Sequence, residues 1–209
     1  MNPVASVLRP SPQAEADARG ALVGIGARGA IAAVIVALLG TVPCTSAQPA
    51  PTRASGVDQT DLTAAFTPGH ALPVVLETIR SARSTIFVAA YSFTSRPVAS
   101  ALLDASRRGV GVQVLVDAGE ATKRYSAARF LANQGVAVRI NARYATQHNK
   151  FMVVDAVCVQ TGSFNYTSSA AERNAENVLV VKNAPALAAQ YSAEWRRLWD
   201  EGTDLGPAY

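Results

Sequence analysis

The sequence has few cysteines and, beyond its first segment, no internal repeat or low-complexity tract. Its two cysteines are Cys44 and Cys158. If the first is removed with a leader, the remaining domain has no internal disulfide and must be stabilised by a hydrophobic core. Cys158 lies in an apolar run and is interpreted as a small buried side chain. A chain of 209 residues that is 49% hydrophobic is long enough for one well-buried domain and too short for two.

The sequence also lacks an apolar run long enough to span a membrane. The run at 30–39 has about ten residues, against the roughly 20 that a membrane-spanning helix needs. Basic residues precede it and small residues follow it, which is typical of a signal peptide. We therefore expect a signal peptide over 1–47, cleaved after Ala47, and a linker over 48–58. The protein is then exported, to the periplasm or the medium; an uncleaved anchor and a lipidated Cys44 are the alternatives.

The charge is mildly basic. The whole chain has 19 basic and 15 acidic residues, and removal of the leader leaves 16 against 13, a net charge of about +3. Such a balance fits a polyanionic partner without identifying one. The basic residues are scattered in pairs at predicted helix ends and loops, and these pairs are interpreted as solvated surface.

From residue 59 to the end, apolar runs alternate with helical patterns, which predicts one domain with a sheet at its centre. Helices are expected at 72–79, 95–109 and 126–133, and a last one is expected after a cap at Asn183. Strands are expected at 85–91, 112–117, 136–140, 151–154, 157–161 and 177–182. The fold class is therefore α/β: an α/β/α sandwich with a central mixed β-sheet.

Polar residues gather around the hairpin predicted at 151–161. Alternate side chains of a strand share a face, so His148 and Lys150 are expected to point the same way while Asn149 points elsewhere. Ser163 and Asn165 arrive at the end of the neighbouring strand. An imidazole, an ammonium, a hydroxyl and an amide that converge without a cluster of acids indicate a phosphate site rather than a metal site.

The spacing of these residues resembles the signature of the phospholipase D superfamily. The stretches AYSFTS at 90–95 and YSAARFLANQGV at 125–136 extend the likeness over nearly all of the expected mature chain. Together they are similar to the small bacterial EDTA-resistant endonucleases of that superfamily, which carry one signature per chain. The six signature residues are His148, Lys150, Asp155, Gly162, Ser163 and Asn165.

A single signature has a consequence for the mechanism. Hydrolysis through a covalent intermediate needs a nucleophile for phosphorus and an acid for the departing oxygen, and one histidine cannot serve as both. A two-fold homodimer would bring two copies of His148 to a shared site, which the resemblance also implies. One copy would form a phosphohistidine while the other donates the proton. Lys150 and Asn165 would neutralise and orient the phosphoryl oxygens, and Ser163 would add a hydroxyl donor.

Supporting roles are assigned to a few further residues. The nucleophilic histidine needs its other ring nitrogen held, and the resemblance favours Glu176 for this role over Glu172. Asp155 lies at a predicted turn and is interpreted as a brace of the hairpin. His70 lacks the signature and is interpreted as a helix-start or surface residue. No cofactor or metal is expected, because no metal-ligand spacing is visible.

The sequence thus predicts a metal-independent phosphodiesterase, a nonspecific endonuclease that acts on DNA as a homodimer without stable membrane association. Whether RNA is a second substrate is left open. A phospholipase D or cardiolipin-type lipid hydrolase is the alternative. A silent nucleic-acid-binding module is a third hypothesis, which the presence of every catalytic residue disfavours. Motif order places Tyr91, Phe93 and Tyr166 near the site, where they either stack on bases or lie in the core.

Overall fold

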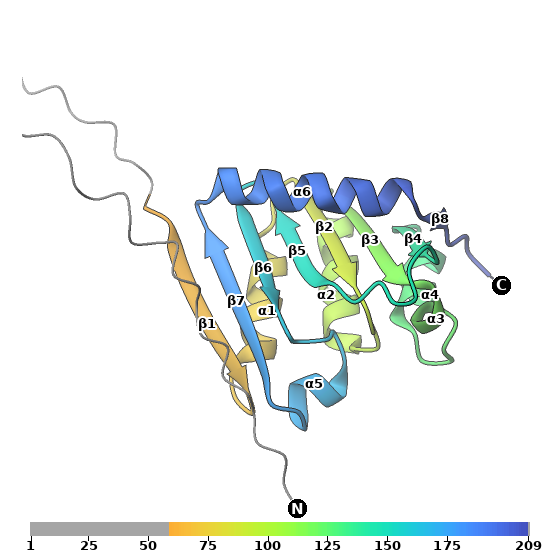
Figure 1. The fold of residues 1–209 in the computed structure, drawn as a ribbon, viewed down its shortest axis with the longest axis horizontal. Coiled ribbons are helices and arrows are strands. Elements are labelled where there is room, and N and C mark those ends of the chain that lie inside the picture. The colour runs from red at the N-terminus through yellow and green to blue at the C-terminus, as the bar shows by residue number, and fades with distance from the viewer. Residues whose placement is uncertain (1–58, 209) are drawn as a thin grey trace, which may run out of the picture. The chain divides into compact units, whose positions relative to one another are not determined.

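A mixed eight-stranded sheet forms the centre of the fold (Figure 1). The computed structural model describes residues 59–208; the predicted signal peptide and linker, with Cys44, lie outside the described residues. The strand order is β1-β7-β6-β5-β2-β3-β4-β8. β2, β3 and β4 are parallel, and every other neighbouring pair is antiparallel. The strands are β1 Asp61–Thr67, β2 Thr85–Ala90, β3 Gly111–Asp117, β4 Ala137–Asn141, β5 Lys150–Val154, β6 Cys158–Gly162, β7 Glu176–Lys182 and β8 Thr203–Asp204.

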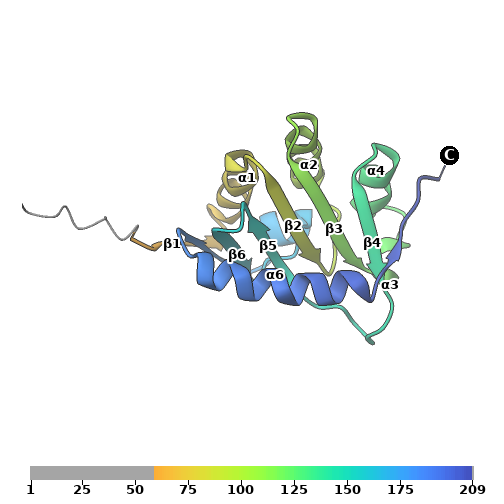
Figure 2. The same cartoon turned by 90° about the horizontal axis from the view of Figure 1, so that it is seen from above.

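Helices cover both faces of this sheet, which confirms the predicted α/β/α sandwich. Figure 2 shows α1, α2 and α4 on one face and α6 alone on the other. In Figure 1, α6 crosses its face near one end of the strands, and α5 lies at the opposite end. The helices are α1 Ala71–Ser81, α2 Arg96–Arg107, α3 Ala118–Ala121, α4 Ala127–Asn133, α5 Ser168–Glu172 and α6 Pro185–Asp200. None of the helices within 59–208 has the length and apolar character needed to cross a membrane.

Of the helix starts of α2 and α6, the first has the expected capping residue and the second does not. The Ser95 side chain accepts a hydrogen bond from the Val98 amide at the start of α2, as predicted. The prediction that Asn183 caps the last helix is wrong. Asn183 has a φ of 53°, and its amide donates to the carbonyl of Gln59, so α6 begins only at Pro185, where the proline supplies a pre-formed helical φ.

The apolar stripe of α6 packs into the core, as its spacing predicts. Trp195 stacks on Phe87 with ring centroids 4.5 Å apart, and its indole nitrogen donates to the Val88 carbonyl at 2.9 Å. The hydrogen bond satisfies the one polar atom of a fully buried indole. α6 is therefore fixed rigidly to the middle of the sheet.

Cys158 is also buried, and burial raises the pKa of its thiol.

The β5–β6 hairpin is braced at its turn, as predicted. Asp155 and Ala156 have φ values of 52° and 56°, the left-handed pair that a tight hairpin turn of this hand requires. The Asp155 carboxylate accepts hydrogen bonds from the amides of Arg83, Ser84 and Thr85 and from the Ser84 hydroxyl, at 2.8–2.9 Å. Burial by itself would raise the pKa of Asp155, but these hydrogen bonds outweigh it and lower the pKa below its ordinary value. This signature residue therefore ties the hairpin to the start of β2.

Strand direction brings the polar signature residues to one end of the sheet. β2, β3 and β6 finish at the end where β5 and β7 begin, because β5 pairs antiparallel with both β2 and β6. The residues that precede β5, follow β6 and open β7 therefore lie together. The Asp155 turn stands at the opposite end of β5.

Candidate active site

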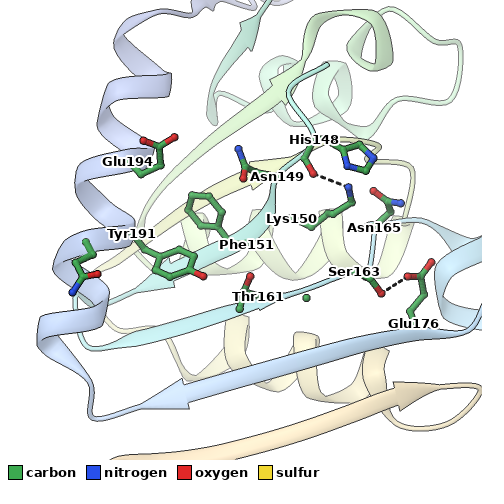
Figure 3. Close-up of a pocket in the computed structure, with 12 residues that line it drawn as sticks. His148, Asn149, Lys150, Phe151, Thr161, Ser163, Asn165, Glu176, Tyr191 and Glu194 are labelled. Carbon is green, nitrogen blue, oxygen red and sulfur yellow. Dashed lines mark hydrogen bonds between the residues drawn. The ribbon is translucent and has the colours of Figure 1, made fainter. Parts of the chain in front are cut away.

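All five predicted site residues line one cavity of about 610 Å³ (Figure 3). Figure 3 shows His148, Lys150 and Asn165 at one end of the cavity, with Ser163 and Glu176 beside them. The far wall comes from α6, with Gln190, Tyr191 and Glu194. The cavity thus joins residues from the loop before β5, the loop after β6, the start of β7 and the middle of α6.

Lys150 is the buried cation of the site. It is the first residue of β5 and only 8% exposed. Its ammonium donates to the His148 carbonyl at 2.6 Å and lies 5.2 Å from the centre of the Tyr91 ring. Burial lowers the pKa of Lys150, and the Glu176 carboxylate partly opposes this shift. A desolvated positive charge acts on a phosphate far more strongly than one in water.

His148 lies in the loop before β5, so the strand alternation used to place its side chain does not apply. β5 begins at Lys150, which pairs with Ala90, and the two residues before it belong to the preceding loop. Asn149 lines the cavity as well instead of pointing away from it. The His148 side chain is exposed, and its ring packs against Tyr91 with centroids 4.6 Å apart. An accessible imidazole held on one side by an aromatic ring is suited to attack a bound ligand.

Two buried residues that the sequence did not single out position this loop. The Asp117 carboxylate accepts a hydrogen bond from the amide of Gln147 at 2.9 Å and, on its other oxygen, one from the amide of Glu120 at 3.1 Å. The Gln147 side chain donates to the Ala90 carbonyl and accepts from the amide of Asn149. Asp117 is the last residue of β3 and Gln147 adjoins the signature, but no spacing pattern joins two positions so far apart in the chain.

Glu176 is held at the site through Ser163. The Ser163 hydroxyl donates to one oxygen of Glu176, and the Asn174 amide donates to the other at 2.8 Å. Within residues 59–208, no hydrogen bond joins Glu176 to His148 of the same chain. Glu172, the alternative candidate, is exposed in α5 and is not among the cavity-lining residues. The structure therefore brings Glu176 to the cavity and leaves Glu172 outside it.

Gly162 allows the two strands that carry these residues to touch. Its φ is 150°, and a Cβ at this position would stand 2.2 Å from the carbonyl oxygen of Asn177. The close approach lets the Ser163 hydroxyl accept a hydrogen bond from the Asn177 amide at 3.1 Å. Glycine is the one residue that fits both the conformation and the contact.

Asn165 contributes an unsatisfied polar group. Its side-chain oxygen is buried and has no hydrogen-bond partner among residues 59–208. Such a group is costly in a folded protein and persists where a ligand or a partner supplies the missing bond. A half-turn of the amide would present its two donors at the same place. Only the orientation that turns the amide nitrogen toward the cavity offers donors to the non-bridging oxygens of a phosphodiester, which are acceptors.

The three aromatic residues placed near the site by motif order divide into two groups. Tyr91 faces the cavity residues His148 and Lys150. Phe93 and Tyr166 are buried in the core, and the Tyr166 hydroxyl donates to Gln160 at 2.7 Å. Burial raises the pKa of Tyr166. The base-stacking hypothesis therefore does not apply to Phe93 or Tyr166.

Residues 75–199 match the family model described as cardiolipin synthase, PLD-like domain. This chain belongs to the phospholipase D superfamily. A phospholipase D of Rickettsia bellii is 34% identical over 142 residues, which are 68% of this chain and 70% of the relative. The mitochondrial cardiolipin hydrolase of Xenopus laevis is 35% identical over 127 residues, which are 61% of this chain and 60% of the relative.

Two solved structures share the fold. Nuc of Salmonella typhimurium, described as a phospholipase D family member, is 37% identical and superimposes with a TM-score of 0.70 over 71% of this chain and 99% of that one. NucT of Helicobacter pylori shares the fold at 22% identity, with a TM-score of 0.64 over 70% of this chain and 100% of that one. As a superfamily member with this cavity, the protein is a phosphodiesterase-type hydrolase. Among residues 59–208, no three His, Cys, Asp or Glu side chains gather as a metal ion would require.

Proposed function

We propose that this protein is a metal-independent endonuclease that hydrolyses DNA, and also RNA, through a phosphohistidine on His148. The observation that carries the proposal is an exposed imidazole beside a buried ammonium in a cavity open to solvent. The buried Lys150 supplies the positive charge that phosphoryl oxygens require. The domain also aligns with 99% of the chain of Nuc and with 100% of the chain of NucT.

The reaction proceeds in two displacements. One His148 nitrogen attacks phosphorus, the bond from phosphorus to the leaving oxygen breaks, and a second histidine protonates that oxygen. The second histidine then takes a proton from water, which attacks the phosphohistidine and frees the 5′- or 3′-phosphate with the first imidazole restored. Lys150 and Asn165 bind the non-bridging oxygens throughout. Glu176, held by Ser163, places a negative charge near the Lys150 ammonium.

The second histidine is proposed to come from another copy of the chain, in a homodimer. The cavity lining contains one histidine, and His70 lies outside it at the start of α1. The face crossed by α6 supports the proposal, because α6 packs on β2, β4, β5 and β6 and leaves apolar side chains of β1 and β7 exposed. Leu62 and Phe66 are 65% and 62% exposed, and Leu179 is 37% exposed. A two-fold mate seated there would bury this patch.

Plasmid cleavage tests the activity. Purified mature protein should nick and linearise plasmid DNA in excess EDTA, and His148→Ala should abolish cleavage while keeping the circular dichroism spectrum of the wild type. Loss of cleavage on addition of EDTA would reject metal independence. Vanadate, whose trigonal geometry mimics the transferred phosphoryl group, should inhibit; indifference to vanadate would count against phosphoryl transfer at this cavity.

Mixed dimers test the shared site. If each site needs two copies of His148, dimers formed from wild-type and His148→Ala subunits are inactive. Activity then falls with the square of the wild-type fraction when the two chains are refolded together at varied ratios. A linear fall would show that each chain carries a complete site and would reject the dimeric mechanism. Sedimentation equilibrium of the same samples reports whether dimers form.

A lipid hydrolase is the second candidate. The exposed Leu62, Phe66 and Leu179 lie on the face that carries the cavity, and an apolar patch beside the site is what a lipid substrate requires. The relatives named phospholipase D and mitochondrial cardiolipin hydrolase also favour it. Cardiolipin and phosphatidylcholine vesicles incubated beside plasmid DNA separate the candidates, because turnover of lipid without DNA cleavage would replace the endonuclease proposal.

Export is proposed on the leader pattern alone. Expression of the full chain in a bacterial host should yield a mature protein that begins at Gln48, detected by N-terminal sequencing of the periplasmic fraction and the medium. Recovery of the uncleaved chain in the cytoplasm would contradict the proposal.

A further inference from the structure

A second cavity of about 730 Å³ opens between the starts of α2 and α4. These two helices cover the face of the sheet opposite α6 (Figure 2). This cavity is separate from the active-site cavity and has no role in the mechanism above. Its lining combines basic, hydroxyl and aromatic side chains. They include Thr94, Arg96, Arg124, Tyr125, Phe130 and Ser168.

The basic and aromatic side chains of this cavity are accessible. Arg96 and Arg124 are both exposed, and neither is paired with a carboxylate in the part of the chain that the structure describes. Tyr125 is 74% exposed, and the Arg124 guanidinium lies 5.6 Å from the centre of its ring. Unpaired guanidinium groups beside an open aromatic ring form a site for a phosphate with an adjoining planar base.

Two chain segments join this cavity to the active site. Tyr91 contacts His148, and Thr94, three residues on, lines the second cavity. Asn165 lines the first cavity, and Ser168, three residues on, lines the second. Three residues of extended chain span at most about 10 Å, so the two cavities are neighbours.

Hydrogen bonds hold the two segments together. The amides of Thr94 and Ser95 both donate to the Tyr166 carbonyl, at 2.9 and 2.8 Å. The amide of Ala127, at the start of α4, donates to the Phe93 carbonyl at 2.8 Å. The wall between the cavities is therefore a bonded, largely buried structure. A ligand that leaves the active site on this side meets the second cavity at a fixed distance.

We infer that the second cavity binds nucleotides that flank the scissile phosphate in single-stranded nucleic acid, with Arg124 and Arg96 on backbone phosphates and Tyr125 stacked on a base. The inference rests on the proposed nuclease function and extends it to a substrate class. A base must be unstacked to lie on Tyr125, which favours single strands over duplex. Stacking and phosphate contacts carry no base preference, in keeping with a nonspecific enzyme. An acyl chain would leave both guanidinium groups without a partner.

Binding is measured first, apart from turnover. A 12-nucleotide single-stranded DNA with a fluorescent end label is titrated into the His148→Ala protein, alone and combined with Arg124→Ala or Tyr125→Ala. Tyr125→Ala should weaken the Kd about 5- to 150-fold, which is the range of one base-stacking contact, with the salt dependence unchanged. Arg124→Ala should reduce the slope of log K against log salt by about 0.7, the value for one phosphate contact on a single strand.

A matched control and a short substrate complete the test. Arg107→Ala removes an exposed arginine from the far end of α2, and its Kd and salt slope should equal those of the parent. In the active enzyme, the loss of kcat/KM caused by Tyr125→Ala should be at least about tenfold greater on the 12-mer than on bis(p-nitrophenyl) phosphate, which is too short to reach the second cavity.

The outcomes separate the two levels of the proposal. Cleavage of the 12-mer in EDTA with equal Kd values for Tyr125→Ala and its parent would overturn the second cavity as a nucleotide site and leave the endonuclease standing. Binding that depends on Tyr125 and Arg124 without any cleavage would reject the endonuclease and keep the cavity as a nucleic-acid site. A selective loss of vesicle hydrolysis in these variants would assign the cavity to lipid and overturn the inference.

Discussion

Asp155→Ala is expected to lower the stability of the protein and to leave its chemistry intact, although Asp155 belongs to the same signature as His148 and Lys150. Its carboxylate accepts four hydrogen bonds from residues 83–85. It stands at the turn that follows β5, whereas Lys150 opens that strand. Asp155 is not among the residues that line the cavity.

The size of the destabilisation follows from these bonds. Hydrogen bonds to a charged group contribute about 1.5–3 kcal/mol each when buried, but Arg83 and Ser84 are exposed and their amides can turn to water. The half-buried amide of Thr85 loses the most. We expect Asp155→Ala to lower the free energy of unfolding by about 2–3 kcal/mol in total. For a domain of this size that corresponds to a fall in Tm of about 4–12 °C.

The pH dependence gives a second signature of the same interaction. The hydrogen bonds hold the pKa of Asp155 below its ordinary value, so its contribution to stability is complete above the unfolded-state pKa of about 3.9. It is lost as the pH falls through the lower, folded-state pKa. The gap in Tm between the wild type and Asp155→Ala should therefore be constant from about pH 5 to 8 and shrink in stronger acid.

Thermal unfolding followed by circular dichroism measures the loss, and hydrolysis of bis(p-nitrophenyl) phosphate at 25 °C measures the chemistry of the folded protein. We expect a kcat within about threefold of the wild type, because no transition-state contact is removed. Asp104→Ala is the control, since Asp104 is an exposed aspartate with one weak contact at 3.8 Å. A hundredfold loss of kcat at an unchanged Tm would refute the structural role of Asp155.

Two further predictions concern the cavity. Lys150→Met should lower kcat by at least about 1,000-fold, because a preorganised cation is lost. The Tm should not fall, because the substitution also removes a desolvated charge. A large fall in Tm together with residual kcat would contradict this. Gly162→Ala should lower the free energy of unfolding by at least about 2 kcal/mol and reduce kcat, because the new Cβ would stand 2.2 Å from the Asn177 oxygen. Urea unfolding and diester hydrolysis measure both effects, and wild-type values would show that the loop has room to shift.

Elements with regular apolar spacing could be predicted, and elements that depend on distant partners could not. The helix that follows Ser95 and the hairpin around Asp155 carry their own local signals. β1 was missed because its largest side chains, Leu62 and Phe66, face outward, and because its pairing partner β7 lies more than a hundred residues away. α3 and α5 are single turns of four and five residues and leave almost no periodicity to detect.

The polar residues that line the candidate cavity could be named from the sequence, but the residues that support them could not. The signature spacing selects Lys150, Ser163 and Asn165 without any knowledge of the fold, and the structure places all of them at one cavity. The loop conformation at His148 depends on a contact between Asp117 and Gln147, which are 30 residues apart. Tyr91 comes just after the last residue of β2, so strand periodicity does not predict where its side chain points. The packing of its ring against His148 shows its place at the site.

The two oxygens of Asp117 give the short helix α3 an unexpected reach. One oxygen accepts a hydrogen bond from the first turn of α3, and the other accepts one from the amide of Gln147, just before His148. A movement of α3 is therefore transmitted to the His148 loop through one rigid carboxylate. Substitutions in α3 that tilt its axis, such as those at Gly119, should therefore alter turnover while every side chain around the substrate keeps its identity. A random-mutagenesis screen for slower or faster variants should find hits in this remote turn.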